Sequence, residues 1–459
     1  MPRKKTAKMS EISHQPMVGA KKSHTAGKFL STKNHPDYEG SAESHPSMTG
    51  GSLENEEVLQ PEINIGMVGH VDHGKTTLLE SLSGKWADTH SEEIKRGITI
   101  RLGYADAIFY KEGDKYTTKP KDMEKAEVLR KVSFVDAPGH ESLMATMLSG
   151  ATIMDGALLL VSASEKCPQP QTREHLMALN IIGVKNVVIV QNKIDLATEE
   201  RALKNYEEIK AFIKGTDYEN APIIPISAQH NVGMSLLIEA IEDSIPTPER
   251  DAKKEPVMFI ARSFDINRPG IDPKDMVGGI LGGSLKQGTL AVGQTIEIRP
   301  GYEVLEKNQK VWKALTTEIA GLKTGGHDVK EVSPGGSIGV LTMLDPSIVK
   351  SDKLGGDVAG LPGKIPEVRY QLALEIHLLE RVVGAKDELT VEPIKPNETL
   401  MLNVNAAATV GVITKLKKDS IECRLKLPVC AEIGARVTLS RMIGNRFRLI
   451  GYGLIKEKL

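Results

Sequence analysis

The sequence predicts an α/β domain, with a parallel sheet and helices on both of its faces, followed by two β-barrel domains. Its length of 459 residues exceeds what one ordinary hydrophobic core supports. From residue 61 to about residue 250, short apolar runs alternate with stretches of helical apolar spacing, which is typical of a parallel sheet. After Pro246 and Pro248 this alternation gives way to short runs separated by glycines, which indicates small barrels.

Composition sets the predicted domain boundaries. The first residues are rich in Lys, Ser, His and Gly and have almost no apolar periodicity, so we expect a disordered basic tail there. The first barrel should contain strands near 278–285 and 292–301, and the second near 409–413 and 424–428. The predicted segments are the tail at 1–60, the α/β domain at 61–250, the first barrel at 251–363 and the second barrel at 364–459.

Charge and cysteine content bear on the compartment. The formal net charge is −1, and the three cysteines, at 167, 423 and 430, are irregularly spaced, which suits a reducing, cytoplasmic setting. We expect no signal peptide and no membrane association, because no apolar run approaches the length of a membrane span. A mitochondrial presequence is the competing interpretation of the tail, and the lack of an amphipathic Arg/Leu pattern disfavours it.

A phosphate-binding loop is predicted at residues 69–76. The pattern is a glycine, four residues and then Gly-Lys-Thr, placed between an apolar strand at 63–68 and a helical stretch. A polyphosphate must be wrapped by backbone N–H groups, and Gly69 and Gly74 remove side chains that would hold the backbone away. A lysine and a threonine at the loop's end supply a cation for the β- and γ-phosphates and a hydroxyl for Mg²⁺. The expected nucleotide contacts here are Val71, Asp72, His73, Gly74, Lys75, Thr76 and Thr77.

A second motif, residues 136–140, ends the apolar strand at 132–135. The carboxylate of Asp136 can hold Mg²⁺ through water, and the backbone N–H of Gly139 can reach a γ-phosphate. His140 would then lie near the attacking water, so we predict a catalytic role for it. The expected nucleotide contacts of this turn are Asp136, Ala137, Pro138 and Gly139.

Two further motifs are expected to select the base. Asp195, after the apolar strand at 187–190, can accept from the N1–H and the exocyclic amine of guanine, a donor pair that adenine lacks. The backbone N–H of Ala228, after the strand at 223–226, is expected to point at the guanine O6. The four motifs in this order predict a guanine-nucleotide site. The expected base contacts are Asn192, Lys193, Asp195, Ser227, Ala228 and Gln229.

Residues 95–100 lie where a loop could close over the nucleotide. Thr99 would give Mg²⁺ a hydroxyl ligand and the γ-phosphate a backbone donor, and it would lose the second contact after hydrolysis. The alternative is that this segment only begins a strand. A carboxylate inside the phosphate loop, at Asp72, is out of place unless it serves a water or a second Mg²⁺. We therefore predict a GTPase that uses GTP or GDP and Mg²⁺, with Thr76, Thr99 and Asp72 as metal ligands and His140, Asp72 and Thr99 as catalytic residues.

On these motifs the chain resembles the translational GTPases related to elongation factor Tu, and among them the gamma subunit of archaeal and eukaryotic translation initiation factor two. Residues 69–76 are typical of translational GTPases in general, whereas residues 95–106 are similar to the gamma subunit's own switch region and residues 440–453 to its closing strands. The resemblance extends from about residue 61 to the end. It implies GTP-dependent binding of methionylated initiator tRNA, delivery to the small ribosomal subunit and release after hydrolysis, with alpha and beta subunits as partners.

The tRNA contacts expected from this resemblance are less specific. Tyr104 follows Thr99 by five residues, so closure of the loop would carry its ring toward the methionine or the terminal adenosine of the tRNA. The alternative is a partly buried strand residue. Two basic clusters either contact tRNA or form a solvated face. They consist of Lys415, Lys417 and Lys418, and of Arg441, Arg446 and Arg448.

Members of this family commonly carry a zinc knuckle of paired Cys-x-x-Cys motifs. Residues 108–130, the corresponding segment, contain no cysteine, so we predict no zinc. Other functions stay open: an elongation-type or selenocysteine-specific aminoacyl-tRNA carrier, a GTPase that assists sulfate activation, or a scaffold that binds nucleotide without cleaving it. The similarity at 102–104 and 440–453 favours the initiation factor over the other carriers, and His140 disfavours the scaffold.

Overall fold

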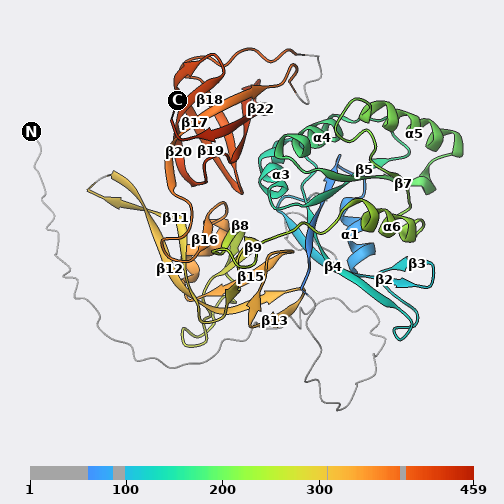
Figure 1. Ribbon diagram of the computed structural model, residues 1–459, viewed down its shortest axis with the longest axis horizontal. Coiled ribbons are helices and arrows are strands. Elements are labelled where there is room, and N and C mark those ends of the chain that lie inside the picture. Colours follow the sequence, from blue (N-terminus) through green and yellow to red (C-terminus); the bar gives the residue numbers. More distant parts are fainter. Residues whose placement is uncertain (1–59, 86–98, 308, 383–388, 459) are drawn as a thin grey trace, which may run out of the picture.

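Three lobes make up the chain, an α/β domain and two β-barrels (Figure 1). This computed structural model describes residues 60–85, 99–307, 309–382 and 389–458. The predicted tail up to residue 59, and residues 95–98 of the predicted switch segment, lie outside the described residues. Among the helices of the described residues, none is both long enough and apolar enough to cross a membrane.

The α/β domain contains a seven-stranded sheet with the order β3-β2-β4-β1-β5-β6-β7. Strands β4, β1, β5, β6 and β7 run parallel, which confirms the predicted parallel sheet. Strands β2 and β3 add an antiparallel hairpin at one edge, because the turn between them, with Gly113 at φ 62°, is too short to cross over the sheet. The strands are β1 (Ile63–Gly69), β2 (Gly103–Glu112), β3 (Lys115–Thr117), β4 (Glu127–Asp136), β5 (Gly156–Ser162), β6 (Asn186–Asn192) and β7 (Ile223–Pro225).

Helices cover both faces of this sheet, as predicted. Side chains alternate between the two faces along a strand, so Leu159 of β5 packs with α3, α4 and α5, whereas Leu158 and Leu160 pack with α1 and α6. The helices are α1 (Lys75–Ser83), α3 (Met144–Ala151), α4 (Pro170–Ile182), α5 (Glu199–Ile213) and α6 (Met234–Ser244), with single 3₁₀ turns η1 (Glu141–Leu143) and η2 (Ile194–Leu196).

Both predicted barrels are present. In the first, the sheet order is β11-β16-β8-β9-β15-β12-β13, and the pairing of β11 with β12 closes the ring. The second is the closed barrel β17-β20-β19-β18-β21-β22. Inward-facing apolar side chains fill them, for example Ile298 and Leu322 in the first barrel and Leu402 and Ile421 in the second.

The strands of the first barrel region are β8 (Val257–Phe264), β9 (Ile280–Gln287), β10 (Leu290–Ala291), β11 (Thr295–Glu306), β12 (Gln309–Thr324), β13 (His327–Val329), β14 (Glu331–Val332), β15 (Ile338–Thr342) and β16 (Val358–Gly360), with α7 (Pro346–Val349) and η3 (Lys350–Asp352). Those of the second barrel are β17 (Val368–Leu378), β18 (Thr399–Val404), β19 (Ala407–Lys417), β20 (Ser420–Cys430), β21 (Arg436–Ile443) and β22 (Arg446–Lys456).

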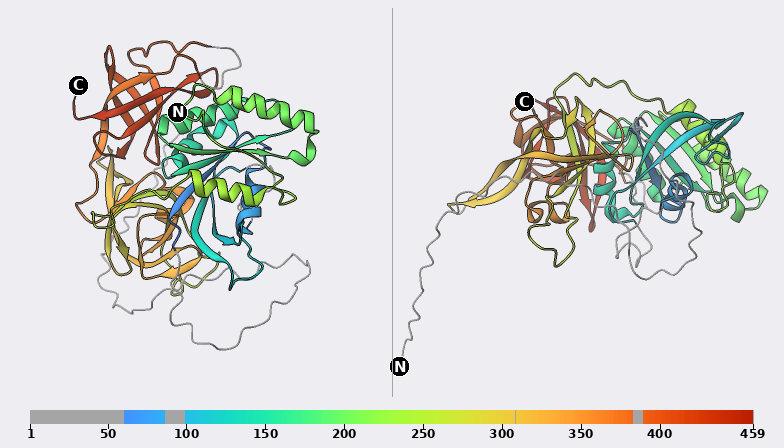
Figure 2. Two further views of the ribbon diagram at one scale, coloured as in Figure 1. Left: turned by 45° about the vertical axis from the view of Figure 1, so that its right-hand side comes forward. Right: turned by 90° about the horizontal axis from the view of Figure 1, so that it is seen from below.

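The α/β domain contacts both barrels, which lie on the same side of it (Figure 2). Asn64 of β1 is fully buried, and its side-chain amide donates to the carbonyl of Gly336 in the first barrel at 3.0 Å. Asn403 of β18 donates to the carbonyl of Ala145 in α3 at 3.1 Å. The barrels also meet each other, and the side chains packed together there are Val257, Val358 and Cys430. Each part of the molecule therefore touches the other two.

Candidate nucleotide site

The phosphate-binding motif forms a tight loop between β1 and α1. Gly69 ends β1 with φ 138°, and a Cβ at this position would lie 2.5 Å from the carbonyl oxygen of Leu160. Gly74 caps α1 with φ 87°, and a Cβ there would lie 2.4 Å from Nδ2 of Asn192. Neither position has room for a side chain, so the path of the loop requires both glycines.

Lys75 places its ammonium group against this loop. The residue is only 7% exposed, and Nζ donates to the carbonyl oxygens of Gly69 at 3.2 Å and His70 at 3.0 Å. Since the N-terminus of α1 points at the same loop, its partial positive charge adds to that of the lysine. The loop therefore presents the charge and the backbone N–H groups that a polyphosphate requires.

Oxygen atoms from three separate segments meet next to the start of α1. The Thr76 hydroxyl donates to Oδ2 of Asp136 at 2.8 Å, and the hydroxyl oxygens of Thr76 and Thr99 are 3.3 Å apart. Hydroxyl and carboxylate oxygens are the ligands that Mg²⁺ prefers, so these residues fit a magnesium ion. Asp72, the other expected ligand, lies exposed in the loop with φ 62°. In the described part of the chain, no group of three His, Cys, Asp or Glu side chains is arranged to hold a metal ion.

The turn after β4 lies directly against the phosphate loop. A Cβ on Gly139 would be 2.5 Å from Nζ of Lys75 and 2.9 Å from the carbonyl oxygen of Gly69, so only glycine allows this approach. Ala137 and Pro138 are buried beside it. His140 is partly exposed, and its Nδ1 lies 2.8 Å from the Ser142 hydroxyl and accepts from the Ser142 N–H at 3.3 Å. The structure thus places Gly139 against the phosphate loop. Nδ1 of His140 is in contact with Ser142 in the same turn.

Asn192, predicted as a base contact, ties three segments together. Its Nδ2 donates to the carbonyl of His73 in the phosphate loop at 2.9 Å, and its Oδ1 accepts from the backbone N–H of Ala228 at 3.0 Å. The Ala228 N–H is therefore directed at Asn192, an acceptor that the motif alone does not reveal. Its contact with the guanine O6 stays a prediction.

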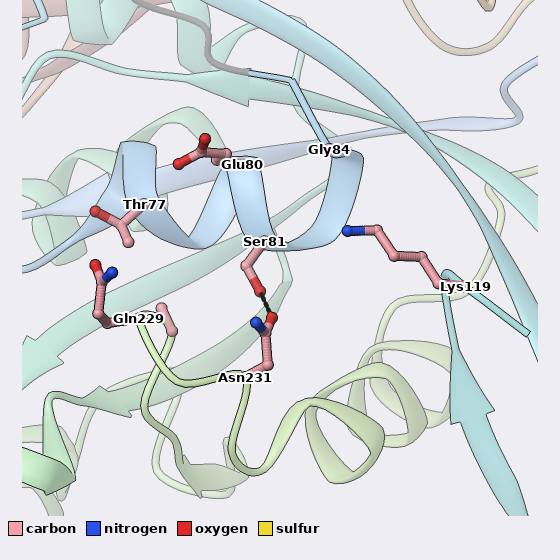
Figure 3. Close-up of a pocket in the computed structure, with 8 residues that line it drawn as sticks. Thr77, Glu80, Ser81, Gly84, Lys119, Gln229 and Asn231 are labelled. Atoms are coloured by element: carbon pink, nitrogen blue, oxygen red, sulfur yellow. Dashed lines mark hydrogen bonds between the residues drawn. The ribbon is translucent and has the colours of Figure 1, made fainter. Parts of the chain in front are cut away.

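The remaining base-contact residues surround an open site. Asp195 has a side chain 25% exposed, with Oδ2 3.7 Å from Nε2 of His230. Lys193 adopts φ 65°, and Gln229 is exposed. Ser227 is buried, and its hydroxyl has no hydrogen-bond partner among the residues that the structure describes. A cavity of about 310 Å³ lies beside this site (Figure 3). It is lined by Thr77, Glu80, Ser81, Gly84, Lys119, Ala228, Gln229 and Asn231. The cavity extends the base site along α1.

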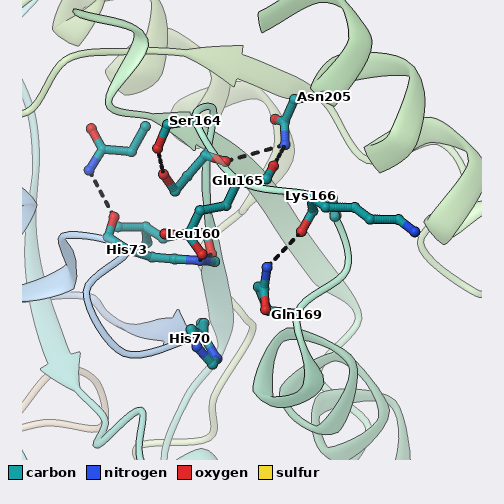
Figure 4. A network of polar contacts seen from close by, with 12 residues as sticks. His70, His73, Leu160, Ser164, Glu165, Lys166, Gln169 and Asn205 are labelled. Atoms are coloured by element: carbon teal, nitrogen blue, oxygen red, sulfur yellow. Dashed lines mark hydrogen bonds and ion pairs between the residues drawn. The ribbon is translucent and has the colours of Figure 1, made fainter. Parts of the chain in front are cut away.

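Two histidines, His73 and His175, support the phosphate loop, and Figure 4 shows the surroundings of His73. His73, predicted as a nucleotide contact, is fully buried, with Nδ1 2.9 Å from the carbonyl oxygen of Leu160 and Nε2 3.6 Å from a carboxylate oxygen of Glu165. Burial lowers the pKa of His73 to about 4. Its imidazole therefore supports the loop from inside the protein, and its backbone carbonyl accepts from Asn192. His175 of α4 accepts from the backbone N–H of Gly69 at 2.8 Å, a contact that the sequence does not predict because the two residues are 106 positions apart.

Tyr104, the predicted tRNA contact, lies in β2 and packs against the core on the α3 and α4 face of the sheet. The residue as a whole is partly exposed, but its hydroxyl is buried and has no hydrogen-bond partner within the described parts of the chain. This burial raises the pKa of the phenol. The guanidinium of Arg262, from the first barrel, is close enough to oppose this shift. Tyr104 therefore stands where the α/β domain meets the first barrel.

Several members of the basic clusters are engaged within the protein. Arg441 and Arg448 have ion pairs with Glu398 and Glu174, and Nζ of Lys415 lies 2.8 Å from a carboxylate oxygen of Glu422. An ion-paired guanidinium is less available to a phosphate backbone than a free one. The Arg441 and Arg448 side chains are each only 14% exposed, so these two arginines are structural contacts within the protein, whereas Lys415 is 68% exposed and lies on a solvated face.

Two protein families match the chain. Residues 60–247 match the family described as "Elongation factor Tu GTP binding domain", and residues 370–455 match "Initiation factor eIF2 gamma, C terminal". Among curated proteins, the chain is 58% identical over 405 residues to translation initiation factor 2 subunit gamma of Methanothermobacter thermautotrophicus, which covers 86% of this chain and 99% of that protein. It is 57% identical over 409 residues to the protein of the same name from Pyrococcus horikoshii, with coverage of 88% and 100%.

Solved structures show the same fold. A bacterial selenocysteine-specific elongation factor EF-Sec superposes with a TM-score of 0.67 at 24% identity, covering 87% of this chain and 59% of that one. The elongation factor SelB from Methanococcus maripaludis, in complex with the GTP analogue GppNHp, superposes with a TM-score of 0.64 at 23% identity, covering 87% and 80%. At these identities the likeness concerns the fold alone.

Proposed function

Because this chain belongs to the gamma-subunit family of translation initiation factor 2, we propose that it holds methionylated initiator tRNA while GTP is bound, brings it to the small ribosomal subunit and releases it after hydrolysis. The chain is thus a translation initiation factor with a GTP-binding domain of the translational GTPase type. The meeting of Thr76, Thr99 and Asp136 carries the proposal of a GTP switch, because it joins the phosphate loop, the switch segment and the turn after β4 at one point.

The residues of the site have different roles in nucleotide binding and in hydrolysis. Lys75 and the backbone N–H groups of the loop hold the β- and γ-phosphates, and Asp195 selects guanine. Mg²⁺, held by Thr76 and Thr99, would neutralise charge between these phosphates. Gly139, already against the loop, donates its N–H to the γ-phosphate, and His140 orients the attacking water.

Release of the tRNA would follow from the loss of the γ-phosphate. Thr99 and Gly139 then each lose a partner, so the segments that carry them are free to move. Tyr104 should move with these segments. Its strand β2 begins only a few residues after Thr99, and β2 pairs with β4, which is followed by the turn that contains Gly139. We therefore place the tRNA-sensing surface where β2 meets the first barrel.

The alternative is an elongation-type or selenocysteine-specific carrier. Structures of the selenocysteine factors share the fold at 23% and 24% identity, whereas the initiation factors share 57% and 58% identity over nearly their full length. Proteins that share a fold at 23% or 24% identity can bind different substrates, so the likeness to the selenocysteine factors does not indicate their substrate. The initiation role is therefore favoured.

The partners we propose follow from the family. They are an alpha subunit on the first barrel, a beta subunit on the α/β domain, and the small ribosomal subunit, all in the cytoplasm. The cofactors are GTP or GDP with Mg²⁺.

Aminoacyl-tRNA binding by the full chain tests the proposal. Methionylated initiator tRNA should bind more tightly with a non-hydrolysable GTP analogue than with GDP, and methionylated elongator tRNA should bind weakly in both states. Equal binding of the two tRNAs, or preference for selenocysteyl-tRNA, would favour the alternative carrier. A chain that binds GTP and no aminoacyl-tRNA would contradict both.

A further inference from the structure

Helix α4 lies between the phosphate loop and the second barrel. It contacts β1 and β5 of the sheet and also β21 and β22 of the barrel. Glu174 and His175 are consecutive on this helix, so their side chains point in directions about 100° apart. Glu174 reaches the barrel, and His175 reaches the phosphate loop. Two neighbouring residues thus connect structures that are distant in the sequence.

His175 fixes the first residue of the phosphate loop. The side chain is 1% exposed, and Nδ1 accepts from the backbone N–H of Gly69 at 2.8 Å. A backbone N–H can only donate, so this nitrogen carries no proton and the ring is neutral. Burial lowers the pKa of His175 to about 3, so acidification does not break the bond near neutral pH. Lys75 holds the carbonyl side of the same glycine at 3.2 Å. The peptide groups on both sides of Gly69 are therefore held.

Two arginines of the second barrel bind α4. Arg448 of β22 forms an ion pair with Glu174, which is 4% exposed, and burial raises the pKa of this carboxyl while the guanidinium opposes the rise. Arg436 of β21 donates to the carbonyl of Ile181 in the last turn of α4 at 2.6 Å. A cation at this end of a helix is favourable because the last carbonyls carry partial negative charge. The position of α4 therefore depends on the docking of the barrel.

We propose that His175 is a positioning residue for the phosphate loop and that the Glu174–Arg448 ion pair couples its position to the second barrel. Without an acceptor, the buried N–H of Gly69 would favour other loop conformations. Nucleotide affinity falls in proportion to the fraction of molecules whose loop is in the binding conformation. Because coupling between two sites is reciprocal, nucleotide binding also affects the docking of the barrel. The inference rests on the proposed binding of guanine nucleotides.

Dissociation of fluorescent GDP and a fluorescent GTP analogue from the full chain tests the positioning role. His175→Leu keeps apolar bulk and removes the acceptor, so both nucleotides should leave faster by about ten-fold. His175→Asn should restore part of the difference, because the Asn Oδ1 lies near the place of Nδ1 and can accept from Gly69. An unchanged rate for the leucine variant overturns the role. If that variant does not fold, His175→Ala replaces it against His175→Asn, and equal rates for these two overturn it.

The coupling is tested by Arg448→Met and a matched control. Arg448→Met should speed dissociation by about three-fold alone and add little in the His175→Leu background, because both changes act on one element. Arg441→Met breaks a comparable ion pair, with Glu398, inside the same barrel, and the other hydrogen bonds of Arg441 stay within that barrel. It should lower thermal stability without changing dissociation. Additive effects in the double variant, or equal acceleration by Arg441→Met, overturn the coupling.

The wild-type chain in the same assay separates this inference from the proposed function. If the wild type binds no guanine nucleotide, the proposed function is wrong. If it binds tightly and every variant releases nucleotide at the wild-type rate, the proposed function stands and only the inference about α4 is wrong.

Discussion

At the scale of single residues, Asp195 should decide which base is bound. Its carboxylate accepts two donors that only guanine offers, and the loss of such charged hydrogen bonds costs roughly 2 to 4 kcal/mol. We expect Asp195→Asn to weaken GTP binding about thirty-fold or more and to reduce the preference over ATP. Calorimetric titration with both nucleotides measures this. His230→Ala is the control, because His230 lies 3.7 Å from the carboxylate without being a base contact. Unchanged GTP affinity in Asp195→Asn would contradict the assignment of the base pocket.

His140 and Asp72 should affect hydrolysis more than binding. With Nδ1 of His140 engaged by Ser142, Nε2 is the nitrogen left to orient a water. A positioned general base typically contributes 10²–10⁴-fold, so His140→Ala should slow single-turnover hydrolysis about a hundred-fold on the ribosome. Asp72→Ala should act in the same direction. Both variants should keep wild-type GTP affinity. A normal hydrolysis rate in His140→Ala excludes the catalytic role, and Ser142→Ala shows how much depends on the turn alone.

Tyr104 allows its two interpretations to be separated by paired substitutions. If the ring stacks on the tRNA end, Tyr104→Ala should weaken methionylated initiator tRNA binding about ten-fold in the GTP state, since such a contact contributes about 1 to 3 kcal/mol. Tyr104→Phe should keep that affinity. It removes a buried hydroxyl for which the described residues offer no partner, so thermal stability should not fall. An alanine variant that loses stability and keeps tRNA affinity identifies Tyr104 as a packing residue only.

At the scale of elements, the turn after β4 depends on close backbone contact. A side chain at Gly139 would meet Lys75 Nζ, which can move, and also the carbonyl of Gly69 and the N–H of Val71, at 2.9 and 3.1 Å, which cannot move cheaply. Gly139→Ala should therefore push the turn away from the phosphate loop. We expect GTP affinity to fall about ten-fold and GDP affinity to fall less, because only GTP uses the Gly139 N–H. Gly113→Ala, in an open turn with nothing within 4 Å, should leave both affinities unchanged. Equal losses for GTP and GDP would contradict the γ-phosphate contact.

The elements differ in how much of them the sequence predicts. The phosphate loop, the turn at Asp136 and the alternating α/β pattern can be predicted, because they depend on residue types at short spacing and on local periodicity. The edge hairpin of β2 and β3 is missed, because β3 has only three residues and such a short segment carries no periodicity that could indicate a strand. The supporting contacts are also missed. His175 and Asn192 act on residues more than a hundred positions away, and only tertiary packing brings such pairs together.

At the scale of the whole molecule, hydrogen bonds and an ion pair connect the α/β domain directly to both barrels. Asn64 of β1 donates to Gly336 and accepts from the hydroxyl of Ser337 at 3.0 Å, both from the first barrel. Arg448 and Arg436 connect the second barrel to α4. Buried polar groups of this kind are costly when their partners move away. Undocking of either barrel should therefore be unfavourable.

The contact between the two barrels contains a buried acid. Asp357 precedes β16 and is 6% exposed, and its Oδ2 accepts from the backbone N–H of Gly301 at 3.1 Å. Burial raises the pKa of Asp357 to about 8, and the hydrogen bond opposes the rise. The second barrel is adjacent, since a Cβ on Gly356 would lie 2.7 Å from Cα of Ala407. The protonation state of Asp357 therefore sets the charge that is buried where the two barrels meet.

Asp357 should make the stability of the protein fall as the pH rises. The folded state keeps the proton up to about pH 8, whereas the unfolded chain releases it at about pH 4, so between these values the folded state binds more protons. The free energy of unfolding should then decrease by up to about 1.4 kcal/mol per pH unit from this group.

Asp357→Asn keeps an acceptor for Gly301 and cannot ionise, so its melting temperature should exceed that of the wild type by a margin that grows from pH 4 to pH 8 and then levels off. Thermal denaturation at several pH values measures the margin. Asp345, an exposed helix cap whose pKa is lowered by its hydrogen bonds with Ser347, is the control: it is ionised in both states above about pH 4, so the margin of Asp345→Asn should stay constant across this range. A margin that is constant with pH for Asp357→Asn would show that the carboxyl is ionised in the folded protein and that the barrel junction carries a negative charge.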